Sequence, residues 1–122
     1  MIDHVMVMNL KRREDKWFYA LGALAVTGFP MHDGTIIRFR SHDSRKYNRA
    51  SSVIKEAVND GFPYFAKYTR PHDPLGKRVL AWQWTWASAL RRIVRMNRCV
   101  MLLIDDFAPA YNWNWKRYCR VV

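Results

Sequence analysis

The chain has 122 residues, 50% of them hydrophobic and 15% aromatic, and its 21 Lys and Arg against 10 Asp and Glu give a formal net charge of +11. This apolar content excludes disorder as the main state, and the length fits one compact domain rather than two. No apolar run reaches the roughly 18 residues of a membrane-spanning helix. No signal-peptide pattern opens the chain, so we expect a cytoplasmic protein.

Strand and helix signals alternate in the first half of the chain. Residues 4–10 form an apolar run that is typical of a strand buried on both faces. A helix is predicted from Glu14, because acidic residues suit a first turn, to Gly28, which can cap the end. A second strand is expected at residues 35–39 and a second helix over residues 47–60.

The second half of the chain continues this alternation. Residues 64–68 are predicted to form a short strand, and residues 69–76, which contain two prolines and a glycine, a loop. A third helix is predicted over residues 79–97 and a buried strand over residues 99–104. The last segment, residues 109–122, mixes aromatic and basic side chains.

The order of these elements predicts the fold class. Alternating strands and helices indicate a single small α/β domain over residues 1–108, with a mainly parallel sheet and flanking helices. The aromatic and basic tail, residues 109–122, is expected to pack on this domain or to extend it. A small sheet leaves an edge to cover, which favours a homodimer.

The third helix is predicted to bury one face. The apolar residues of that face recur at helical spacing and are Trp82, Trp86, Ala89, Leu90 and Ile93. Trp84 alternates with two of these residues and is therefore expected to point away from the core. Ser88 and three arginines are expected on the opposite, solvent-facing side.

The three arginines, Arg91, Arg95 and Arg98, form a basic stripe at helical spacing. Such a stripe could follow the phosphates of a nucleic acid or contact an acidic protein, and the aromatic tail would add stacking. The alternative is that the stripe is the solvated face of an amphipathic helix. The net positive charge favours anionic partners without selecting one of them.

Two groups of residues lie at the carboxyl ends of predicted strands. One is the segment from Asn9 to Arg13, which includes Arg12, and the other is the pair Asp105 and Asp106. Ligands of open α/β sheets bind beyond the carboxyl ends of the strands. Paired carboxylates there suit a hard divalent cation shared with phosphates, which Arg12 and Arg13 could contact. The alternative is that the two aspartates only cap a turn.

Short landmarks also occur in order along most of the chain. Residues 7–17 lead from an apolar strand through Asn-Leu and basic residues into a helix, and an Asp-Gly turn follows at Asp33. A Trp-bearing helix, residues 86–94, precedes an apolar strand that ends in Asp105 and Asp106. In this order the landmarks resemble those of family 25 glycosyltransferases of the lipopolysaccharide-biosynthesis type.

The resemblance implies a GT-A-like fold that binds a nucleotide-diphosphate sugar and transfers the glycosyl group to an acceptor. It also implies that Asp105 and Asp106 hold Mn²⁺ or Mg²⁺ against the sugar diphosphate. The residues that it implies around the nucleotide are Asn9, Leu10, Arg13 and Asp33.

Overall fold

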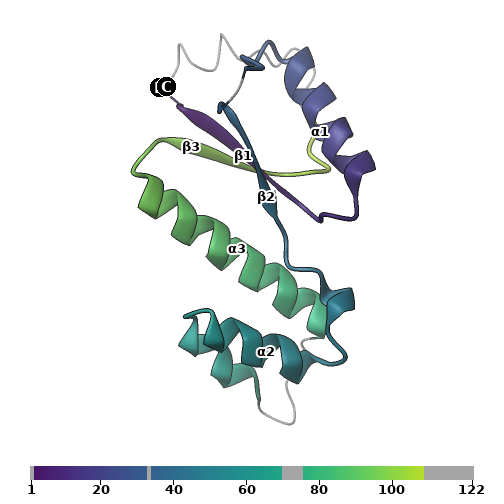
Figure 1. Ribbon diagram of the computed structural model, residues 1–122, viewed down its shortest axis with the longest axis vertical. Helices are drawn as coiled ribbons and strands as arrows, with labels where there is room; N and C mark the ends of the chain where they lie inside the picture. Colours follow the sequence, from purple (N-terminus) through teal and green to yellow (C-terminus); the bar gives the residue numbers. More distant parts are fainter. Residues whose placement is uncertain (1, 33, 70–75, 109–122) are drawn as a thin grey trace. The chain divides into compact units, whose positions relative to one another are not determined.

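The computed structural model describes residues 2–32, 34–69 and 76–108 (Figure 1). Its strands and α-helices alternate in the order expected from the sequence. They are β1 (His4–Asn9), α1 (Glu14–Val26), β2 (Ile36–Arg40), α2 (Ala50–Asn59), α3 (Lys77–Met96) and β3 (Val100–Ile104). Two 3₁₀ segments, η1 (Ser44–Lys46) and η2 (Pro63–Thr69), flank α2. The tail, residues 109–122, lies outside the described residues.

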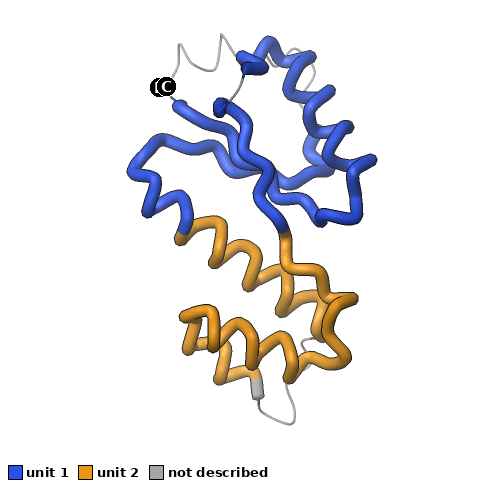
Figure 2. The backbone as a smooth tube through the Cα atoms, viewed as in Figure 1, with its two compact units in different colours: residues 1–40, 92–122 blue, residues 41–91 orange. Residues whose placement is uncertain are grey.

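The chain divides into two compact units (Figure 2). Unit 1 combines residues 1–40 with residues 92–122, and unit 2 is the continuous segment 41–91. Unit 1 contains the sheet and α1, whereas unit 2 is built from helical elements. None of the described helices is both long enough and apolar enough to cross a membrane.

The sheet of unit 1 has three parallel strands in the order β2-β1-β3. In the central strand, Val5 and Val7 pack against Ala20 and Leu24 of α1 and against Phe29. The alternate side chains of β1 point to the opposite face, where Met6 and Met8 are also buried. The prediction of a parallel α/β sheet, with a strand buried on both faces, is therefore confirmed.

Helix α1 begins and ends close to the positions that the sequence predicts. Glu14 and Asp15 occupy its first turn, where negative charge is favourable. At the other end the hydroxyl of Thr27 donates a hydrogen bond to the carbonyl of Leu24 at 2.5 Å. Gly28 follows with a φ of 77°, a conformation that glycine adopts without strain.

Unit 2 has its own hydrophobic core. It is formed by buried side chains of α2, η2 and α3, which are Val53, Ile54, Ala57, Phe65, Leu80, Ala81 and Trp84. The predicted strand over residues 64–68 is wrong, because this segment is the 3₁₀ helix η2. Phe65 of this segment is buried and contacts the rings of Phe62, Tyr64 and Tyr68.

The second helix begins later than predicted. The carboxylate of Asp43 accepts a hydrogen bond from the backbone N–H of Arg45 at 3.1 Å and starts the short segment η1. Tyr47 then adopts an extended backbone, with φ −120° and ψ 136°, so α2 starts only at Ala50. A side chain that caps a turn offers the backbone an alternative to the helix, which the apolar periodicity alone did not show.

The predicted core face of α3 is confirmed for Ala89 but is wrong for its tryptophans and for Leu90. Trp84 is buried with 5% of its surface exposed, whereas Trp82 and Trp86 are 40% and 36% exposed. Ser88, expected on the solvent side, is buried as well, and Leu90 is exposed. A polar contact explains the burial of Trp84. Its indole N–H donates a hydrogen bond to the carboxylate of Asp60 at 2.8 Å, so the ring can be buried without leaving this donor unpaired.

Candidate ligand site at the carboxyl edge of the sheet

Asn9, the last residue of β1, is the centre of a polar cluster. Its side chain is 1% exposed, and its amide nitrogen donates to the carbonyl of Arg13 at 3.0 Å and to Oδ2 of Asp105 at 2.6 Å. Its amide oxygen accepts two hydrogen bonds from Arg38, from Nε at 2.9 Å and from Nη2 at 2.6 Å. Asn9 therefore links β2, the loop that follows β1, and the turn that follows β3.

All of the hydrogen-bonding capacity of this buried amide is used. A side-chain amide has two N–H donors and two acceptor lone pairs on its oxygen. A buried polar group without partners costs free energy, so a residue at the end of an apolar strand needs these contacts to be buried. Because the amide is neutral, Asn9 holds the Arg38 guanidinium and the Asp105 carboxylate near each other while lying between them.

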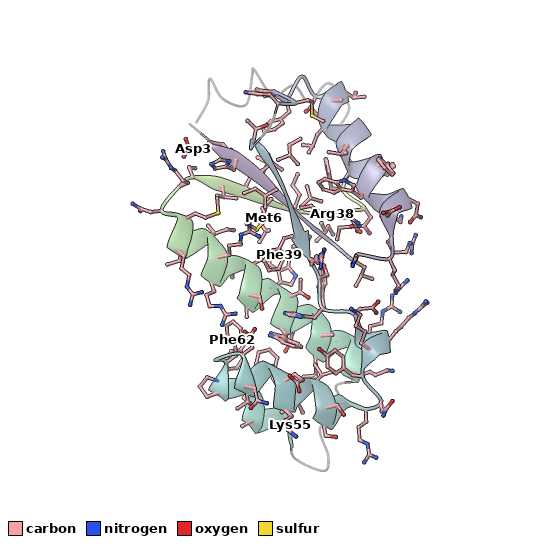
Figure 3. All side chains as sticks on the ribbon, viewed as in Figure 1. Asp3, Met6, Arg38, Phe39, Lys55 and Phe62 are labelled. Atoms are coloured by element: carbon pink, nitrogen blue, oxygen red, sulfur yellow. The ribbon has the colours of Figure 1, made fainter. Side chains whose placement is uncertain are left out.

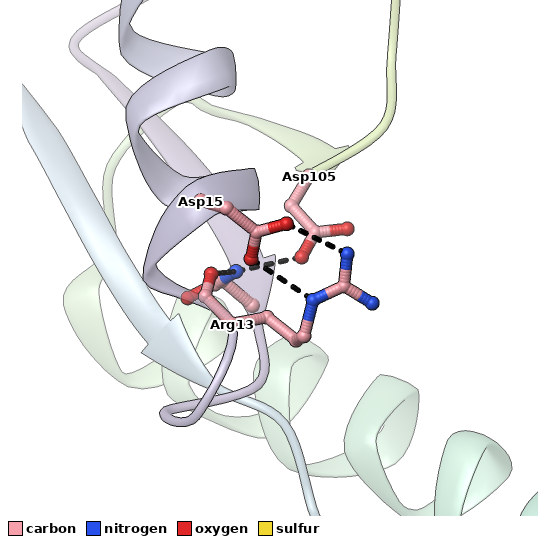
Figure 4. Close-up of polar contacts among 4 residues, drawn as sticks. Arg13, Asp15 and Asp105 are labelled. Carbon is pink, nitrogen blue, oxygen red and sulfur yellow. Dashed lines mark hydrogen bonds and ion pairs between the residues drawn. The ribbon is translucent and has the colours of Figure 1, made fainter.

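Arg13 and Asp15 form an exposed ion pair beside Asp105 (Figure 4). Nε and Nη2 of Arg13 donate to Oδ1 and Oδ2 of Asp15 at 2.9 and 2.8 Å. These hydrogen bonds lower the pKa of Asp15 to about 2. The hydrogen bond with Asp15 and the negative charge of Asp15 raise the pKa of Arg13, and the charge of Asp105 adds to this rise. Asp15 therefore already balances the charge of Arg13.

Arg38 was not singled out from the sequence. It extends from β2 toward α1 (Figure 3), where its guanidinium carbon lies 5.2 Å from the ring centroid of Trp17. Nη2 also lies 3.3 Å from the carbonyl oxygen of Lys11. The available signal was an arginine inside an apolar strand pattern next to the predicted site, which calls for a polar partner on the same face of the sheet.

The two aspartates after β3 differ in their surroundings. Asp105 is half-buried and accepts the hydrogen bond from Asn9, whereas Asp106 is exposed. They lie in a turn in which the N–H of Phe107 donates to the carbonyl of Ile104 at 3.2 Å. Within residues 2–32, 34–69 and 76–108, no three His, Cys, Asp or Glu side chains gather as a metal-binding group.

Of the remaining predicted nucleotide contacts, Leu10 and Arg12 lie in the described part of the chain. Leu10 is half-buried and Arg12 is exposed, and both lie in the loop between β1 and α1, close to Asn9 in the sequence. Asp33 lies outside the described residues. The structure therefore brings together Asn9, Arg13 and Asp105 of the predicted set and adds Arg38 to them.

The basic stripe of α3 is only partly exposed. Nη2 of Arg91 donates to Oδ1 of Asp60 at 3.0 Å, Nη1 donates to the backbone carbonyl of Asp60, and the guanidinium covers the ring of Phe62. Partial burial raises the pKa of Asp60, but the hydrogen bonds that Trp84 and Arg91 donate to it outweigh this effect. The pKa of Asp60 therefore lies below its ordinary value. Arg91 thus serves the packing of unit 2, while Arg95 and Arg98 are exposed.

No protein-family model, no curated protein and no solved structure matches this chain. The fold and the cluster around Asn9 are therefore the basis for proposing a function: the chain is a small α/β protein with a three-stranded parallel sheet and a built polar site at its carboxyl edge.

Proposed function

We propose that the carboxyl edge of the sheet binds a nucleotide-diphosphate sugar together with a divalent cation, Mn²⁺ or Mg²⁺. The observation that carries this proposal is the position of Asn9 at the end of β1, where its amide holds the carboxylate of Asp105, which follows β3, and the guanidinium of Arg38, which extends from β2. Ligands of parallel α/β sheets bind at this edge. A diphosphate needs positive charge, and a cation that it carries needs oxygen ligands, so the two kinds of group suit one ligand.

The residues present fit a hard cation. Asn9 donates to one oxygen of Asp105, which orients the carboxylate and leaves its second oxygen for a ligand. Asp106, the next residue in the chain, adds an exposed carboxylate. Mg²⁺ and Mn²⁺ are commonly held by one or two carboxylates, with substrate phosphates and water as the other ligands.

Glycosyl transfer to an acceptor is the reaction that this site would serve. A bound divalent cation would neutralise charge on the diphosphate as the bond to the sugar breaks. In this proposal Asp105 and Asp106 hold the cation, and Asn9 orients Asp105. Leu10, Arg12 and Arg13 belong to the loop that would face the nucleotide. The order of landmarks that resembles family 25 glycosyltransferases supports the same substrate class.

The test is thermal unfolding of the whole chain with uridine and guanosine diphosphate sugars, with and without Mn²⁺. A ligand at about 100 times its Kd should add about 2.7 kcal/mol to the free energy of unfolding. We expect a Mn²⁺-dependent rise in Tm that Asp105→Asn and Asp106→Asn each reduce. Glu56→Gln is the matched control, because it removes one exposed carboxylate from unit 2. A rise in Tm that is the same in all variants, or no rise with any donor, would contradict the proposal.

A second candidate is a binding module for a nucleic acid or an acidic protein. It is favoured by the composition of α3, which contains basic residues and no Asp or Glu from Lys77 to Met96, and by the exposure of Arg95 and Arg98. Its test is the double variant Arg95→Glu and Arg98→Glu, assayed against a single-stranded oligonucleotide at increasing salt. Binding that falls steeply with salt and is lost in this variant would support the module.

A further inference from the structure

Building on the proposed function, we infer that Arg38 is the anion-binding residue of the site and takes a phosphate oxygen of the diphosphate. The sequence directed attention to Arg12 and Arg13 for this role. The surroundings of Arg38 and Arg13 in the structure point to Arg38 instead.

No carboxylate among the described residues forms an ion pair with Arg38. In the described part of the chain, Arg13 pairs with Asp15 and Arg91 pairs with Asp60, but Arg38 forms no ion pair. All of its contacts there are with neutral groups, namely the amide of Asn9, a backbone carbonyl and an indole ring. A half-buried guanidinium without a counter-ion attracts an anion more strongly than one that already has a partner.

Arg38 also keeps donors for a ligand. A guanidinium has five N–H groups. Nε and Nη2 contact Asn9 and the carbonyl of Lys11, whereas the two N–H groups of Nη1 meet no hydrogen-bond partner among the described residues. One end of the planar group is thus held by the protein, and the other end retains the pair of donors that suits a phosphate oxygen.

The guanidinium is fixed before any ligand arrives. Two hydrogen bonds to the buried amide of Asn9 and the contact with Trp17 restrict the side chain of Arg38. A long side chain that is already ordered loses little conformational entropy on binding, which strengthens the interaction. Asn9 also donates a hydrogen bond to Asp105. The side-chain amide of Asn9 therefore lies between the anion site at Arg38 and the carboxylate proposed to hold the cation.

The experiment uses inorganic pyrophosphate as the probe, without divalent cations, so that it does not depend on Asp105 or on a sugar. Calorimetric titration of the whole chain should show binding, and Arg38→Gln should weaken it at least about tenfold, as expected for the loss of a charged hydrogen bond. The matched control is Arg78→Gln, which removes the same charge from an exposed position of α3 in unit 2. We expect it to bind pyrophosphate nearly as well as the parent chain. Arg13→Gln tests the competing assignment of the anion site to Arg13, and it should lose less affinity than Arg38→Gln.

A second measurement covers the case in which Arg38→Gln does not fold. In the parent chain, the Nε–H of Arg38 is held by Asn9, so its ¹⁵N–¹H resonance should be observable and should shift during the titration. Absence of pyrophosphate binding, an unchanged Arg38 resonance, or loss of binding in Arg13→Gln with retention in Arg38→Gln would each overturn the assignment. Failure with pyrophosphate alone would still leave cation-dependent binding of the nucleotide sugar to be judged by its own test.

Discussion

The imidazole of His42 lies flat on the indole of Trp84, with ring centroids 3.5 Å apart and an angle of 9° between the planes. Nε2 of His42 lies 3.1 Å from the hydroxyl of Ser88, and the backbone N–H of His42 donates to the hydroxyl of Thr85 at 2.9 Å. Trp84, Thr85 and Ser88 are buried residues of α3. Stacking and hydrogen bonding therefore attach the segment after β2 to this helix.

This arrangement predicts a pH dependence of stability. Burial lowers the pKa of His42 to about 4; Asp60 acts in the opposite direction, and Arg91 lowers it further. The pKa of an unfolded histidine is about 6.5, so the unfolded chain takes up the proton first. The stability contributed by neutral His42 is fully present above pH of about 6.5 and is lost as the pH falls toward 4.

The pKa itself can be measured by following the ring resonances of His42 in an NMR titration. Urea unfolding at pH 7, 6 and 5 should then show that the parent chain loses more stability than His42→Phe, in which the ring stack is kept without a titrating group. A constant difference between the two proteins over this range, or a midpoint of His42 near 6.5, would contradict the expectation.

The helix α3 was predicted, but its tryptophans were assigned to the wrong faces, for a reason that the same contacts explain. Periodicity counts apolar side chains, and it favoured Trp82 and Trp86 over Trp84 as core residues. The structure buries Trp84 because two residues distant in the sequence contact it. His42 stacks on its ring, and Asp60 accepts the hydrogen bond from its N–H. Long-range polar partners of this kind leave no trace in a local pattern.

The sheet was easier to predict than α3. The apolar run of β1 is continuous, and a strand with both faces buried needs no knowledge of its neighbours. The same holds for Asn9 and Asp105, because Asn9 ends one apolar strand, Asp105 directly follows another, and parallel strands end at one edge. Arg38 was missed because its role depends on register: it is paired with Val7 of β1, which brings its side chain within reach of Asn9.

Removing the carboxylate of Asp60 should destabilise unit 2. In Asp60→Ala the indole N–H of buried Trp84 and the guanidinium of half-buried Arg91 both lose a partner. The expected cost is about 1–3 kcal/mol in the free energy of unfolding, measured by chemical denaturation. Glu56→Ala, at an exposed position of α2, should change stability by less than about 0.5 kcal/mol. Equal effects of the two substitutions would show that the Asp60 contacts contribute little.

Asn9→Ala should destabilise the sheet more than any exposed substitution. It removes both donors and the acceptor that link Arg38, the carbonyl of Arg13 and Asp105. We expect a loss of about 2–4 kcal/mol and faster hydrogen exchange of the β1 amides. Asn59→Ala, at the exposed end of α2, is the matched control. A β1 exchange rate unchanged by Asn9→Ala would exclude a central role for this amide in the stability of the sheet.

The residue after α3 adopts a left-handed backbone. Asn97 has a φ of 51°, which suits asparagine or glycine at the end of a helix and disfavours β-branched residues. Asn97→Gly should therefore leave stability within about 1 kcal/mol of the parent chain, whereas Asn97→Val should lower it by about 1–2 kcal/mol. Thermal unfolding of both variants gives the comparison, and a valine variant as stable as the glycine variant would refute the expectation.

The strand order β2-β1-β3 has a consequence for how the chain folds. Asp3 and Cys99, 96 residues apart, exchange hydrogen bonds where β1 meets β3. Closing a loop of this length costs about 4 kcal/mol or more of chain entropy, whereas the contacts of unit 2 all fall within the continuous segment 41–91. During synthesis that segment is complete before β3 emerges. The edge that carries Asn9, Arg38 and Asp105 is therefore assembled only after β3 has been made, which places the candidate site among the last features of the protein to form.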